Sequence, residues 1–212
     1  QGRSALDSPA PVDVIGGETM SNQGDTDMSN LLRNVIPSYN VNDQPISDAA
    51  TLVRPANLRG LAPDHTLMLV NGKRRHRASV ITWLGNGISN GSQGPDAAAI
   101  PGAALKRIEV LRDGASAQYG SDAIAGVMNF VLNDSAEGGS LEVRYGEYKE
   151  GDGEQVTIAG NIGLPLGDNG FLNLTAEWGE SDPTSRSEQR GDAQTLIDNG
   201  YQDVPAPAMI WG

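Results

Sequence analysis

The sequence has no cysteine among its 212 residues. Disulfide-stapled scaffolds, zinc–thiolate sites and thiol nucleophiles are therefore excluded. It also has no apolar run near the roughly 18 residues that a membrane-spanning helix requires, although a spanning β-strand needs only about ten alternating residues. Positive charge is scarce, since 15 Lys and Arg stand against 27 Asp and Glu and the net charge is −12. Broad nucleic-acid binding is not expected from such a chain, because phosphate contacts require clustered basic side chains.

Catalytic motifs are weak. The only two histidines, His65 and His76, lack the spacing of a metal site. The segment GISNG (87–91) formally matches the nucleophile elbow G-x-S-x-G, but the elbow lies between a strand and a helix, whereas a Gly/Asn-rich loop precedes Ser89 and SQGP follows it. Nothing in the placement of the carboxylates singles out an acid pair, although counting alone leaves one open. We expect no enzyme, no metal and no cofactor.

Glycine is abundant, with 27 residues against a usual share of about 7%. This composition favours turns and close backbone approaches over long helices. The first 135 residues alternate short apolar segments with turn signals. The elements that we predict are an edge strand at 12–15, a helix within 26–37 capped by Asp27, strands at 67–70, within 105–114 and at 123–132, and a single helical turn near 116–120.

One basic cluster stands out in this acidic chain. KRRHR (73–77) follows an Asn-Gly turn and opens a long Gly/Ser/Asn-rich loop that carries Trp83. Long loops in compact domains are often functional, and arginine suits carboxylate, phosphate or an anionic metal chelate. The alternative interpretation is a solvated turn, or partners for acidic groups elsewhere.

The composition changes after about residue 135. Three segments, at 139–148, 154–164 and 171–180, alternate apolar and polar residues strictly. Their length, with a short turn between the last two and polar loops on the other side, matches transmembrane β-barrel strands. A half-buried soluble β-meander is the alternative, and it predicts that the face carrying Ile158, Leu174 and Trp178 is buried in a core.

Four motifs, taken in order, carry a family resemblance. They are PVDVIGGE (11–18), LLRNVIPSYNV (31–41), NLRGLAPDHTLMLVNGKRR (57–75) and IPGAALKRIEVLRDGASAQYGSDAIAGVMNFVL (100–132). Together they resemble the plug domain of TonB-dependent outer-membrane receptors, and the alternating segments resemble the first strands of the barrel that encloses the plug. The resemblance covers residues 11 to 180.

The resemblance implies a fold and a function. The fold is α+β: a plug (1–135) with a small mixed sheet and short helices, followed by antiparallel transmembrane β-barrel strands (136–212) that form an incomplete barrel. Family members have about 22 strands, so we expect a fragment of a longer receptor, with the TonB-contacting segment upstream of this chain. The function is nutrient import across the outer membrane of a Gram-negative bacterium, with energy coupled through TonB. The partners are TonB, outer-membrane lipid and a nutrient such as a ferric chelate (siderophore-iron), cobalamin or an oligosaccharide.

The resemblance also implies roles for residues. Arg59 and Arg112 are expected to project to the barrel interior and pair with carboxylates of the wall. If the ligand is anionic, its contacts are expected at Arg74, Arg75, His76 and Arg77 with Trp83. Two other functions stay open: a receptor that senses ligand without importing it, and a soluble secreted β-protein.

Overall fold

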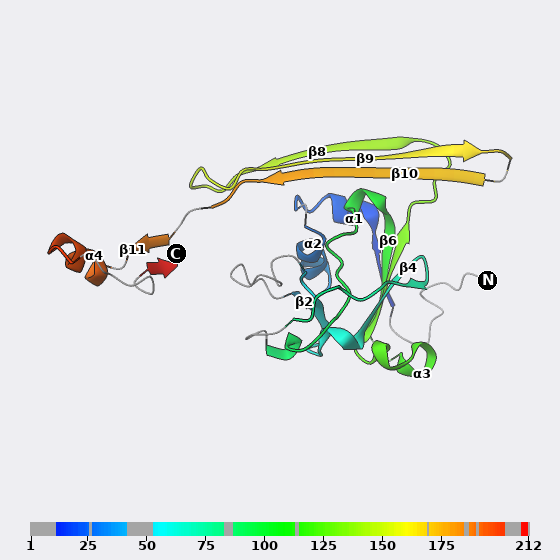
Figure 1. The fold of residues 1–212 in the computed structure, drawn as a ribbon. Coiled ribbons are helices and arrows are strands. Elements are labelled where there is room, and N and C mark those ends of the chain that lie inside the picture. The colour runs from blue at the N-terminus through cyan, green and yellow to red at the C-terminus, as the bar shows by residue number, and fades with distance from the viewer. Residues whose placement is uncertain are drawn as a thin grey trace. The chain divides into compact units, whose positions relative to one another are not determined.

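The computed structural model describes residues 12–25, 27–41, 53–82, 87–112, 115–168, 170–184, 187–189, 191–201 and 209–211 (Figure 1). The chain divides into two compact units, one formed by residues 1–144 and 157–178 and the other by residues 145–156 and 179–212. Among the described residues, no helix has the length and apolar character needed to cross a membrane.

A five-stranded mixed sheet forms the centre of the first unit. Its strands run in the order β1-β6-β7-β4-β5, and β4 and β7 pair in parallel while the other neighbours are antiparallel. One face packs into the main core through Ile108, Met128 and Phe130, each fully buried. The strand bounds are β1 Val12–Gly16, β4 Thr66–Val70, β5 Lys73–Arg74, β6 Leu105–Leu111 and β7 Gly126–Leu132. The predicted mixed sheet and edge strand are confirmed.

Two short helices cover this core face. Helix α1 (Gly17–Ser21) and helix α2 (Met28–Val35) follow β1 directly. Helix α2 begins at Asp27, whose Oδ1 accepts a hydrogen bond from the Ser29 amide at 2.8 Å, as the sequence predicts. The buried face of α2 is then formed by residues one helical turn apart, which are Met28, Leu31 and Leu32.

Shorter elements complete the unit. A hairpin joins β2 (Tyr39–Val41) to β3 (Ala56–Leu58). The remaining turns are α3 (Ser116–Tyr119) and the 3-10 turns Pro63–His65, Gly87–Ser89, Gly102–Ala104 and Ser121–Ala123. The last of these corrects a boundary: the strand that we expected from residue 123 begins at Gly126, because Ser121–Ala123 forms a turn before it.

Three long strands follow the mixed sheet: β8 (Gly139–Gly146), β9 (Gln155–Leu166) and β10 (Gly170–Ser181). They form a separate sheet in the order β10-β9-β8, and neighbouring strands run in opposite directions (Figure 1). The three predicted strands are therefore confirmed. The predicted boundary at residue 135 falls in the connection between β7 and β8 and stays a prediction.

The two faces of this sheet differ as the alternation predicts. Ile158, Leu174 and Trp178 are 41%, 50% and 54% exposed. The soluble β-protein interpretation requires these side chains to be buried in a core, and in this structure they are not. Ala159 of β9, on the opposite face, is buried.

The described residues of the second unit form three further elements. Strand β11 (Ser187–Gln189) pairs antiparallel with β12 (Met209–Trp211), and helix α4 (Gly191–Asp198) lies between them in the sequence. We expected only a polar connection here. Residues 191–198 (GDAQTLID) instead form a helix, which Thr195 supports by donating a hydrogen bond from Oγ1 to the Gly191 carbonyl.

Candidate functional site

The basic segment, defined as Lys73–Arg77, is positioned by a tight turn at the edge of the mixed sheet. Asn71 and Gly72 both have positive φ, 49° and 74°, which is the conformation of the hairpin turns that favour Asn-Gly. The Asn71 side chain accepts a hydrogen bond from the Leu132 amide, and the Gly72 amide donates to the Asn129 side chain, both at 2.9 Å. The start of the basic segment is thus anchored to β7.

Two arginines of the segment share one carboxylate. Arg74 Nη1 lies 2.7 Å from Asp122 Oδ2, and Arg77 Nη2 lies 3.5 Å from Asp122 Oδ1. Arg74 also donates to the Tyr119 carbonyl at the end of α3. The three charged side chains are exposed or nearly so, hence these pairs contribute little to stability and leave guanidinium groups accessible to solvent.

The other side chains of the basic segment do not gather with Arg74 and Arg77 as the sequence suggests. Arg75 Nε donates to the Asp96 carbonyl at 2.9 Å, at the far end of the long loop. His76 Nδ1 lies 3.0 Å from the Arg77 carbonyl. Trp83 lies outside the described residues. The structure therefore brings Arg74 and Arg77 together and directs Arg75 to the loop.

Arg59 and Arg112 lie in different settings. Arg59 has a positive φ of 57°, and its Nη1 lies 3.5 Å from the Ala125 carbonyl. Arg112 binds Asp13 of β1, with Nε 2.6 Å from Oδ2. The carboxylate on Arg112 thus comes from the mixed sheet itself, and pairing of either arginine with the barrel wall stays a prediction.

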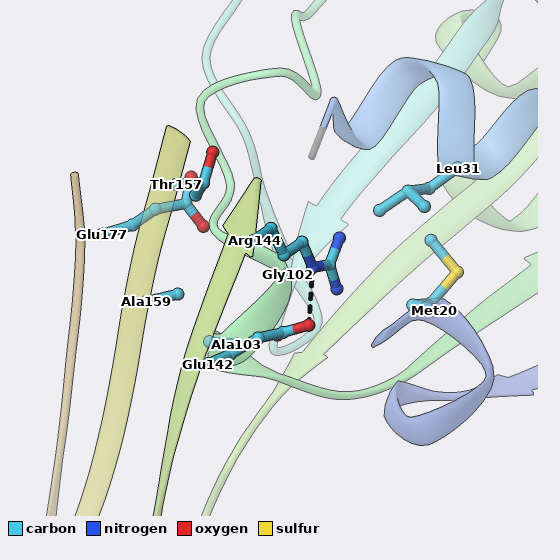
Figure 2. A pocket seen from close by; sticks show the side chains of 9 residues that line it. All are labelled: Met20, Leu31, Gly102, Ala103, Glu142, Arg144, Thr157, Ala159 and Glu177. Carbon is cyan, nitrogen blue, oxygen red and sulfur yellow. Dashed lines mark hydrogen bonds and ion pairs between the residues drawn. The ribbon is translucent and has the colours of Figure 1, made fainter. Parts of the chain in front are cut away.

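Within the first unit, a pocket lies between the polar face of the three-stranded sheet and the surface formed by α1, α2 and the Gly102–Ala104 turn (Figure 2). Arg144 and Glu142 of β8 reach into it, and Arg144 Nε lies 2.5 Å from Glu142 Oε1. Arg144 Nη1 also donates to the carbonyl of Asp25, in the connection between α1 and α2. The other lining residues are Met20, Leu31, Gly102, Ala103, Thr157, Ala159 and Glu177.

The serine of the GISNG segment does not have the geometry of a nucleophile elbow. Ser89 ends a 3-10 turn, is buried, and donates from Oγ to Asn57 Oδ1 at 3.2 Å. In the described part of the chain, no three His, Asp or Glu side chains gather as a metal site would require.

Sequence reasoning missed Asp122 and the Glu142–Arg144 pair. The alternation in β8 did place Glu142 and Arg144 on one polar face, which was the available signal. Arg144 binds the carbonyl of Asp25, which lies 119 residues earlier in the chain, and no spacing rule predicts such a pairing.

Comparison with known proteins gives one family match. The model of the TonB-dependent Receptor Plug Domain matches residues 4–127. The chain is 29% identical over 209 residues to the ferrienterobactin receptor of Escherichia coli, covering 95% of this chain and 26% of that protein.

Solved structures agree with this match. The chain is similar to a mutant ferric enterobactin receptor of Pseudomonas aeruginosa in complex with enterobactin, with a TM-score of 0.64 and 26% identity over 82% of this chain and 25% of the other. A ferric citrate transporter in its unliganded form, 20% identical, shares the fold with a TM-score of 0.63 over 84% of this chain and 26% of its own. The chain spans about a quarter of the length of the relatives it matches.

Proposed function

The chain belongs to the family of TonB-dependent receptor plug domains, and from this premise we propose that it is the plug and initial barrel segment of a receptor that imports a scarce nutrient. The observation that carries the proposal is the order of the elements. A mixed sheet with the family match is followed directly by three strands whose apolar side chains face outward. Such strands suit the lipid-facing wall of a barrel.

The location and partners follow from the same premise. The receptor resides in the outer membrane of a Gram-negative bacterium, where the face carrying Leu174 and Trp178 contacts lipid. TonB is the energy-coupling partner. The protein performs no covalent chemistry; it binds its ligand, and the plug then rearranges to open a path.

The ligand is a ferric siderophore. Two observations support this choice: the relatives named above are a ferrienterobactin receptor and a ferric enterobactin receptor, and the basic segment exposes guanidinium groups suited to an anionic chelate. The contacts are Arg74, Arg75, His76 and Arg77, with Trp83 of the following loop. Cobalamin and an oligosaccharide are the competing ligands.

The test uses the full-length receptor with ferric enterobactin as the probe. We expect measurable binding, no competition by cobalamin or maltodextrin, and a growth defect on limiting iron when the gene is deleted. The double variant Arg74→Ala/Arg77→Ala should weaken binding by about tenfold or more, since hydrogen bonds from charged donors are each worth about 1.5–3 kcal/mol.

A control variant removes an exposed positive charge outside the basic segment. Lys106 lies outside the basic segment, and its Nζ binds Asp134 at 2.7 Å. Because screened surface charges contribute little, Lys106→Ala should leave the affinity for ferric enterobactin within about twofold of the wild-type value. If both variants weakened ferric enterobactin binding equally, the loss would reflect the overall charge of the protein and not contacts made by the basic segment. Binding of cobalamin instead of the ferric chelate would reject the ligand assignment.

A further inference from the structure

In the connection between α1 and α2, described at residues 22–25 and 27, side chains bind partners within the plug. The carboxylate of Asp25 accepts a hydrogen bond from the Asp27 amide at 2.9 Å. Asp27 caps α2 through Ser29 and forms an ion pair with Arg54. We call residues 22–25 and 27 the connector. The carboxylates of Asp25 and Asp27 thus bind groups of the plug. The backbone carbonyl of Asp25 instead accepts a hydrogen bond from Arg144 of β8.

Arg144 binds Glu142 and the Asp25 carbonyl through different N–H groups. Nε binds Glu142 of its own strand at 2.5 Å, and Nη1 binds the Asp25 carbonyl. A guanidinium group holds its donors in a rigid planar fork, so one side chain bridges the two partners, whereas an ammonium group is a single point charge. The carboxylate of Glu142 orients the fork, because the ion pair is the stronger, charge-assisted bond.

The surroundings distinguish this pair from an ordinary surface pair. Arg107 and Glu109 of β6 are also two residues apart on one strand and lie 2.8 Å apart, but the Arg107 side chain is 37% exposed. The Arg144 side chain is 19% exposed and lies beside Met20 and Leu31, which are themselves buried (Figure 2).

Small residues form part of the lining of this pocket. Gly102 and Ala103 line the pocket from the plug side, and Ala159 lines it from β9. Glu177 of β10 lines the same pocket (Figure 2). We call strands β8 to β10 the wall. With Glu142 and Glu177, the wall side of the pocket carries negative charge around Arg144. The wall thus holds the positive charge in place and presents it to a neutral backbone carbonyl of the plug.

We propose that Arg144 is a clasp: a positioning residue of the wall that holds the connector of the plug against β8. The two bonds are unequal, so separation of the connector from the wall breaks the carbonyl bond while Glu142 retains the guanidinium group. The clasp is therefore able to close again when the connector returns. Since the acceptor is the backbone carbonyl of Asp25, the side chain of Asp25 is not needed for this hydrogen bond.

The test is amide hydrogen exchange in the full-length receptor. Gln23 and Asp27 report on the connector, because their amides donate hydrogen bonds to the Met20 carbonyl and to Asp25 Oδ1. We expect Arg144→Ala to speed their exchange by about tenfold or more, as expected from losing one charge-assisted hydrogen bond. Arg144→Lys keeps the charge but loses the fork, and should also speed exchange at these amides.

The matched control is Arg107→Ala, which breaks an arginine–glutamate pair of the same spacing on β6. It should change exchange in the connector by less than about twofold. Unchanged exchange in Arg144→Ala, wild-type exchange in Arg144→Lys, or an equal rise in Arg107→Ala would each overturn the clasp. If Arg144→Ala is not recovered in folded form, Arg144→Lys decides alone.

This inference rests on the proposed function only in taking residues 1–135 as a plug that moves against the barrel strands. The exchange measurement needs no ligand. Absence of ferric enterobactin binding by the wild-type receptor would therefore reject the ligand assignment while leaving the result for the clasp intact.

Discussion

At the scale of single residues, glycine marks the positions where backbones meet. Gly126 opens β7 with φ of 148°, and a Cβ atom there would lie 2.3 Å from the Leu111 carbonyl oxygen. Gly17 is similarly close to β6, since a Cβ atom on it would lie 2.2 Å from the Leu105 carbonyl oxygen. Both neighbours are backbone atoms, which cannot move aside as a side-chain tip does.

The first prediction concerns Gly126→Ala. We expect it to destabilise the plug by about 2 kcal/mol or more, because the added methyl group meets backbone and the conformation is strained for an L-residue. Hydrogen exchange of β6 and β7 amides in the full-length receptor measures this. Gly16→Ala is the control: Gly16 is extended, and apart from its chain neighbours no atom of the described residues lies within 4 Å of its Cβ position. No loss is therefore expected, and a similar loss would contradict the steric argument.

A second residue-scale prediction is a pH dependence. A hydrogen bond from Lys106 holds the pKa of Asp134 below its usual range. A lowered pKa stabilises the fold above the unfolded pKa, about 4, and that contribution is lost as the pH falls through the folded value. Asn133, whose amide donates to the Ala104 carbonyl at 2.8 Å, should lose protection below about pH 4 after correction for intrinsic rates.

The matched variant for this pH dependence is Asp134→Asn, which cannot titrate at this position. Its exchange at Asn133 should show no step below about pH 4. A step of the same size in the variant would assign the pH dependence to another group.

At the scale of elements, the N-terminus of α2 combines two roles in one side chain. Asp27 Oδ1 caps the helix and Oδ2 binds Arg54. The cap was visible in the sequence as an Asp before an amphipathic segment. The pair with Arg54 was not, because it joins positions 27 residues apart.

Substitution of Asp27 separates these roles. We expect Asp27→Ala to destabilise α2 by about 1 kcal/mol or more through loss of the cap. Asp27→Asn retains a capping oxygen and loses the ion pair, so its cost should be smaller. Thermal unfolding and exchange of the Ser29 amide measure both. An equal cost for the two variants would show that the charge, and not the cap, is what α2 requires.

At the scale of the whole molecule, the outward face of β8 to β10 bears on whether the protein contacts lipid or water. Its apolar side chains are exposed, including Leu174 and Trp178. A water-soluble sheet with one exposed face ordinarily carries polar residues there, since alternation places the apolar face on a core. The proposed lipid contact explains the pattern.

Leu174→Arg tests the lipid contact. In a bilayer the variant should cost about 2–4 kcal/mol near the midplane and reduce the amount of folded receptor in the outer membrane. Leu174→Phe, which stays apolar, should be tolerated. On a water-exposed face the order would reverse, and Arg would be accepted at least as well as Phe. Heat-modifiability of the membrane-extracted receptor measures the folded fraction.

Local chemistry accounts for what was predictable. Asp27 before the apolar positions of α2, the Asn71–Gly72 turn after β4 and the strict alternation in β8 to β10 each act over a few residues, so the sequence determined these elements and the family motifs that they carry. The start of β7 was misplaced by three residues, because Ala123 to Ala125 are as apolar as a strand and the preceding turn is set by contacts with other segments.

Only the tertiary structure decided which charges meet. It joined Arg74 and Arg77 at Asp122, Arg112 to Asp13, and Arg144 to the Asp25 carbonyl. Each contact joins segments distant in the chain, and its energy depends on burial and geometry that exist only after the sheets pack. The sequence by itself determined the strands and their faces, because side-chain alternation is local; it left the partners of the arginines open, since any of the many carboxylates satisfies the same local chemistry.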